Sequence, residues 1–120
     1  MSYNLAERFA HLSTLRPNWD SYGARPPAFE AMSAARRYVE SLSGPADYAP
    51  TVCPMVTGGL QVVWYTSGFD IEIDFDPAGK PVAHVYEHAI KDDTALDDDL
   101  ALASPKLVAA LARFGVKAAA

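Results

Sequence analysis

The sequence has little of several features that would assign a function directly. Its 120 residues contain one cysteine, Cys53, which excludes an internal disulfide framework. We expect Cys53 to be a small buried hydrophobic side chain. No apolar run approaches the length of about 18 residues that a membrane span needs, and the N-terminus lacks a basic-then-apolar signal pattern. The sequence therefore predicts a cytoplasmic protein with no membrane partner.

Motifs for common enzymatic chemistry are also missing. The chain has no Gly-rich phosphate loop, no Cys/His zinc spacing and no nucleophile elbow. Basic side chains are scarce in residues 59–100, which carry two Lys or Arg against ten Asp or Glu, whereas residues 1–58 carry five of each kind. Phosphates need a basic surface, so this acidity argues against direct nucleic-acid binding by residues 59–100.

The clearest pattern that is present lies between Gly59 and Glu87 and predicts an antiparallel three-strand meander. Apolar and acidic residues alternate through 69–76, which indicates a strand with one buried face and one wet face. A tight turn at Ser67-Gly68 pairs Trp64 with Ile71 on the buried face.

A second turn, Asp76 to Lys80 with Gly79 in a left-handed bulge position, pairs Ile71 with Val85. The two turns independently give the same inner and outer faces. A register shift of one residue would place every side chain on the opposite face of the sheet. The agreement between the two turns therefore fixes the register.

The outer face of this meander holds the candidate binding residues. Aromatic side chains surrounded by charge suit a protein interface, and the negative field favours a basic partner such as a nucleic-acid-binding protein. A homodimer through this face and a plain solvated face are the alternatives. The predicted interface comprises Val63, Tyr65, Asp70, Glu72, Asp74, His84 and Tyr86.

The same side chains keep an enzymatic hypothesis open. Carboxylates beside an imidazole can hold a divalent metal, with His88 near the end of the group, and Glu72 beside His84 could act as an acid–base pair. Such sites need a concave and partly dry pocket, which a flat sheet face lacks. We therefore favour a non-catalytic protein-binding or regulatory module without catalytic residues, metal or cofactor. A metal-dependent hydrolase that uses the Asp/Glu/His cluster is the alternative.

Helical periodicity flanks the meander and completes the predicted fold class, α+β in a single domain of residues 1–120. We expect two N-terminal helices, a three- or four-stranded antiparallel meander sheet and one C-terminal helix, with the helices on one face of the sheet. The predicted bounds are a helix from Asn4 to Arg16, a helix from Pro26 to Gly44, an edge strand over Thr51–Val56 and a helix from Ser104 to Gly115.

The remaining segments are predicted to be irregular. Residues 17–27 form a connector in which Trp19 and Tyr22 plug the corner between the first two helices, with a binding loop as the alternative. Residues 91–99 are predicted to form a solvated acidic loop. Residues 117–120 are expected to fray.

Three segments together carry a resemblance to an uncharacterised group of small bacterial and phage proteins. They are Asn18-Trp-Asp-Ser-Tyr-Gly-Ala24 after Leu12-x-x-Leu15, then Pro50-Thr-Val-Cys-Pro54, then Gly58-Gly-Leu-Gln-Val-Val-Trp64. The resemblance spans roughly residues 12–76 and implies an architecture and a phage or mobile-element context, but no activity. Members of the group often carry an acidic residue before the strand Trp, where this chain has Val63.

Overall fold

The computed structural model describes residues 5–44, 49–65, 69–87 and 95–118, with the backbone alone for residues 69, 87, 95–100 and 118. The expected cap Asn4, the turn Ser67-Gly68, His88 and residues 91–94 lie outside the described residues. The helices are α1 (Leu5–Leu12), α2 (Phe29–Glu40) and α3 (Pro105–Ala112). The strands are β1 (Leu42–Ser43), β2 (Thr51–Pro54), β3 (Leu60–Tyr65), β4 (Phe69–Phe75), β5 (Pro81–Glu87), β6 (Ala95–Leu100) and β7 (Lys117–Ala118).

The α+β class is confirmed, and the main sheet has more strands than predicted. Its order is β2-β3-β4-β5-β6, with every neighbouring pair antiparallel. The expectation of a loop was wrong for residues 95–99, because they lie in β6. Aspartate has a low strand propensity, so the local sequence gave no sign of this strand. Pairing with β6 nevertheless satisfies backbone groups of β5 that would otherwise lie at an edge.

The predicted register of the meander is confirmed at every described pair. Trp64 lies opposite Ile71, and Glu72 lies opposite His84. In the β4–β5 turn, Gly79 has a φ of +85°, as the bulge position requires, and its N–H donates to the carbonyl oxygen of Asp76 over 2.8 Å.

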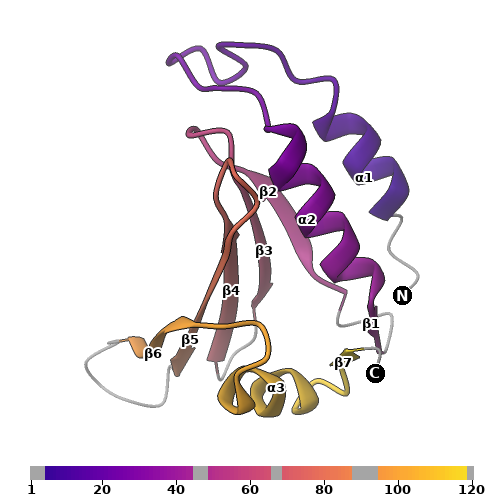
Figure 1. Cartoon of the computed structure of the whole chain (residues 1–120), viewed down its shortest axis with the longest axis vertical. Coiled ribbons are helices and arrows are strands. Elements are labelled where there is room, and N and C mark those ends of the chain that lie inside the picture. Colours follow the sequence, from indigo (N-terminus) through magenta and orange to yellow (C-terminus); the bar gives the residue numbers. More distant parts are fainter. Residues whose placement is uncertain (1–4, 45–48, 66–68, 88–94, 119–120) are drawn as a thin grey trace.

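All three helices contribute to one core on the inner face of the sheet (Figure 1). Helices α1 and α2 lie along the sheet, whereas α3 crosses near one end of the strands. The buried inner residues of the sheet include Trp64, Ile71 and Ile73, and none of the described Asp or Glu side chains is buried. The core therefore forms on the side that the alternation pattern predicts.

Helix ends differ from their predicted positions. Helix α1 ends at Leu12 rather than Arg16, and α2 begins at Phe29 after an extended Ala28, two residues beyond the Pro26-Pro27 pair. Ser104 precedes Pro105 as expected, but its side chain makes no capping hydrogen bond. Residues 117–118, expected to fray, instead pair with β1 as a small second sheet.

The connector between α1 and α2 is a self-supporting loop. The Asp20 carboxylate accepts hydrogen bonds from the Tyr22 and Ala24 N–H groups, and these bonds, with Tyr22 the leading cause, lower the pKa of Asp20. The indole N–H of Trp19 donates to the Arg25 carbonyl over 2.7 Å, and the residue is partly buried. Tyr22 is 91% exposed, so the expectation that it plugs the helix corner is wrong.

Candidate functional site

The outer face of the main sheet carries the predicted interface residues in the expected order. Asp70 lies between Tyr65 on β3 and Tyr86 on β5, and Glu72 lies between Val63 and His84. Val63 faces this side but is only 1% exposed, because the strands on both sides place Thr51 and Glu72 against it. Val63 therefore offers almost no surface to a partner, contrary to the expectation from its position.

Tyr65 is the most prominent side chain of this face, at 66% exposure. Partial burial and the negative charges of Glu72, Cys53 and Asp70, in that order of effect, raise the pKa of the Tyr65 hydroxyl. The carboxylates therefore exert a field at the phenol. An aromatic ring beside two carboxylates can take a cation by stacking and ion pairing at once.

Cys53 lies on the same outer face, opposite Gln61. It is a free thiol and is partly exposed, so the expectation of a buried small hydrophobic side chain is wrong. Strand β2, which carries it, lies at an edge of the main sheet, where the described residues provide a neighbouring strand on one side only.

Three side chains on β4 and β5 form a tight group of possible metal ligands: Glu72, Asp74 and His84. One donor atom from each lies within 4.8 Å of the others. The His84 Nε2 atom is 3.4 Å from Asp74 Oδ2, and the two side chains are 14% and 28% exposed. The amide of Gln61 donates to Asp74 Oδ1 over 3.0 Å, which holds the other carboxylate oxygen toward His84.

A cavity of about 380 Å³ adjoins this group of ligands. Asp74 and His84 line it, and Lys80 and Thr57 add an ammonium group and a hydroxyl. The outer face is therefore hollowed at this point, whereas the alternation pattern alone predicted a flat surface. Gln61 lies opposite Asp74 as the predicted register requires, whereas Thr57 and Lys80 were not among the predicted site residues, because their proximity depends on the connections between the strands.

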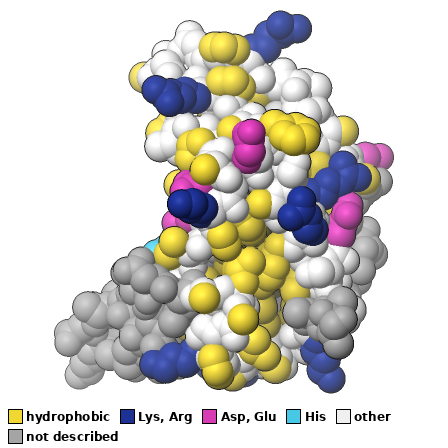
Figure 2. Space-filling model, viewed as in Figure 1, with side chains coloured by type: hydrophobic (Ala, Val, Ile, Leu, Met, Phe, Trp, Pro, Cys, Tyr) yellow, Lys and Arg dark blue, Asp and Glu magenta, His cyan; other side chains and the backbone are white. Residues whose placement is uncertain are grey.

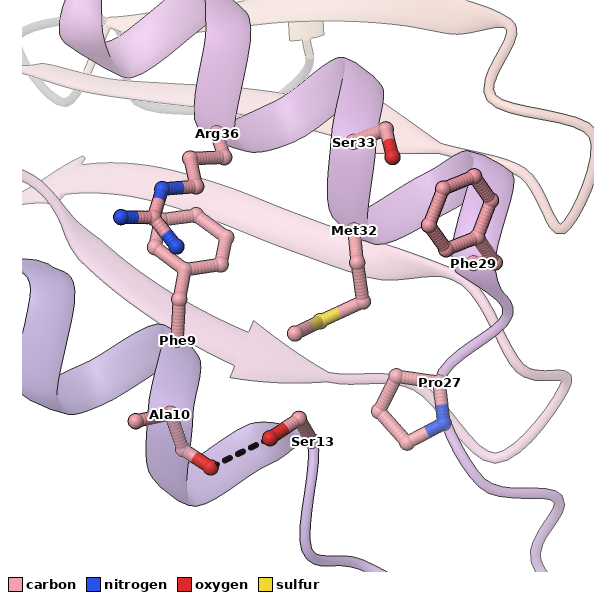
Figure 3. A pocket seen from close by; sticks show the side chains of 8 residues that line it. All are labelled: Phe9, Ala10, Ser13, Pro27, Phe29, Met32, Ser33 and Arg36. Carbon is pink, nitrogen blue, oxygen red and sulfur yellow. Dashed lines mark hydrogen bonds between the residues drawn. The ribbon is translucent and has the colours of Figure 1, made fainter.

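A larger cavity, of about 420 Å³, lies between α1 and α2 (Figure 3). Its walls are mainly apolar, with Phe9, Phe29 and Met32 directed toward it. The Arg36 guanidinium lies 5.9 Å from the centre of the Phe9 ring and forms an ion pair with Glu40. No carboxylate, imidazole or thiol lines this cavity, so its described lining offers no acid–base pair or metal ligand set.

Comparisons with protein-family models, with curated proteins and with solved structures found no match to this chain. The resemblance to the group of small bacterial and phage proteins therefore stays a prediction. Within the described part of the chain, no helix is long and apolar enough to span a bilayer.

Proposed function

We propose that this protein is a small non-catalytic module that binds a basic protein partner on the outer face of its main sheet. The observation that carries the proposal is the setting of Tyr65, an exposed ring directly opposite Asp70 on β4, with Glu72 two residues further along the same strand. Lys and Arg side chains suit such a site, because they can stack on the ring and pair with the acids.

The arrangement of the neighbouring strands supports this choice of partner. Tyr86 lies across Asp70 on the other side, and its ring stacks near that of His84, with centroids 6.2 Å apart. Aromatic groups in the centre with charges between them are typical of recognition surfaces. The predicted resemblance to small bacterial and phage proteins implies no activity, and a phage or mobile-element origin of the module is part of the proposal.

Charge reversal of the outer face tests the proposal. The probe is a synthetic arginine-rich peptide, added to isotope-labelled protein and followed by amide chemical shifts. We expect shifts to concentrate on Tyr65, Asp70, Glu72 and Tyr86, and the D70K/E72K double variant to bind at least about tenfold more weakly. The salt dependence of binding should also flatten, because fewer ion pairs form.

The matched control is E30K/E40K, which changes the net charge equally at two exposed positions on α2. It should keep binding within about twofold, since neither position lies on the sheet and the exposed Arg36–Glu40 ion pair that it breaks contributes little. Equal losses in the two double variants would show that the peptide responds only to net charge, and the outer face would then not be the site.

A second candidate function, a metal-dependent hydrolase, is favoured by one specific observation. Glu72, Asp74 and His84 converge within 4.8 Å beside a cavity that could admit a small substrate. Two carboxylates and an imidazole suit a divalent ion such as Mn²⁺ or Zn²⁺. Lys80, in the lining of the same cavity, would then attract an anionic substrate.

Calorimetric titration with Mn²⁺, Zn²⁺ and Mg²⁺ distinguishes this candidate from the first. The hydrolase requires one ion per chain, bound at least about tenfold more weakly by the Asp74→Asn variant. Asp70→Asn is the control, because it removes a carboxylate from the same face but outside the ligand group. Absence of stoichiometric binding, or an equal effect of both variants, rejects the metal site and leaves the protein-binding proposal in place.

A further inference from the structure

A groove on the helical side of the molecule belongs to neither candidate site. Two cavities, of about 390 and 320 Å³, share Tyr38 and Leu102 in their linings and so meet at these residues. Phe75 and Pro81 from the inner face of the sheet line the first cavity, together with residues of α2. Residues of α3, including Val108 and Leu111, line the second. We call this feature the α2–α3 groove.

The surface of the α2–α3 groove is apolar, and the charges at its sides are positive. The rings of Tyr38 and Phe75 lie 6.1 Å apart, and burial raises the pKa of Tyr38 to about 12, so the phenol stays neutral. The charged side chains that line the two cavities are both cationic, Arg37 and Lys117. Figure 2 shows hydrophobic side chains gathered in the middle of this face, with Lys and Arg side chains and several Asp and Glu side chains around them.

The sheet beneath the groove limits the conformation of any occupant. Strand β4 is paired with β3 and β5, and β5 is paired with β4 and β6. Within the described residues, β4 therefore has no open edge at the base of the groove, because Phe75 is paired with β3 on one side and with β5 on the other. A segment that enters an apolar groove must satisfy its backbone hydrogen bonds internally, which an α-helix does.

We infer that the α2–α3 groove binds an amphipathic helix of another protein, with acidic residues beside its apolar stripe. The apolar stripe packs on Tyr38, Leu102 and Val108. The flanking carboxylates pair with Arg37 on one wall and Lys117 on the other. The partner is thus opposite in charge to the one proposed for the outer sheet face, and the two sites are independent.

The exposure of Val108 indicates that the described residues do not fully cover the apolar surface of α3 at this point. Its spacing in α3 predicts a place in the buried stripe with Leu107 and Leu111, yet its side chain is exposed and lines the groove. A helix docked there would cover this side chain and extend the core.

The test uses a designed peptide of about 15 residues, roughly four helical turns, with leucines on one face and glutamates on both flanks. Binding to the full chain is measured by fluorescence anisotropy. A second peptide carries lysine in place of each glutamate. We expect the glutamate peptide to bind at least about tenfold more tightly than the lysine peptide.

Variants of the protein then locate the binding. R37E/K117E and, separately, Val108→Glu should each weaken binding of the glutamate peptide at least about tenfold. These three side chains are exposed, so the fold should persist, which circular dichroism checks. The matched control R16E/R25E reverses two exposed cations that line neither cavity, and it should bind within about twofold of the unmodified chain.

Three outcomes would overturn the inference. The first is no measurable binding of the glutamate peptide, and the second is equal binding of both peptides. The third is a dimer, seen by sedimentation, that dissociates in the Val108→Glu variant, because a second copy of the chain would then be the occupant of the groove.

Discussion

Replacing Trp64 with alanine should lower the free energy of unfolding by roughly 3–5 kcal/mol, the range for large-to-small changes in a core. Trp64 is 3% exposed and belongs to the cluster that joins the sheet to the helices. Its cross-strand partner is Ile71 on β4, which is fully buried. Alanine would lose the buried area of the indole and leave a cavity that the strands cannot close.

Urea denaturation followed by circular dichroism measures this effect without relying on tryptophan fluorescence, which the substitution itself alters. The control is Tyr65→Ala, which removes a large ring from the next residue of the same strand on the exposed face. Its cost should stay below about 1 kcal/mol. Similar losses in both variants would mean that the two faces of β3 have been assigned wrongly.

Gly79→Ala should destabilise the protein by about 2–5 kcal/mol, from two separate causes. Gly79 has a φ of +85°, where a residue with a Cβ atom costs about 1–2 kcal/mol. An added Cβ would also lie 2.7 Å from the carbonyl oxygen of Glu30 in α2. Backbone atoms of a helix cannot move aside cheaply, and overpacking of this kind costs about 1–3 kcal/mol more.

Gly23→Ala separates the two causes. Gly23 has a similar φ of +83°, but an added Cβ would meet no atom within 4 Å. This variant should lose about 1–2 kcal/mol, from the backbone conformation alone. The difference between the two variants, measured by the same denaturation, reports how tightly the β4–β5 turn packs on α2. Equal losses would show that the turn moves away from the helix without cost.

The meander could be predicted from the sequence alone, because the features that specify it are local. The alternation over residues 69–76 and the turn at Gly79 are both contained in short segments, and they fix which side chains share a face. The placing of Asp70, Glu72 and His84 on one outer face followed from that register. The helices that cover the inner face were also predictable, although their ends were displaced by one to four residues.

Tertiary structure decided the features that depend on contacts between distant segments. Strand β6 pairs with β5 despite its aspartates, and β7 pairs with β1 from the other end of the chain. The burial of Val63 depends on side chains from both neighbouring strands. Local propensity contains none of this information, because it reflects only the preferences of neighbouring residues.

The same distinction applies to the candidate sites. The sequence placed Glu72, Asp74 and His84 on one face, but the hollow beside them also requires Lys80 from the turn and Thr57 from the β2–β3 connection. The exposure of Tyr22 follows from a loop that satisfies its own polar groups and so needs no buried ring. The α2–α3 groove depends on how two helices far apart in the sequence pack beside the sheet, which is a property of no single segment.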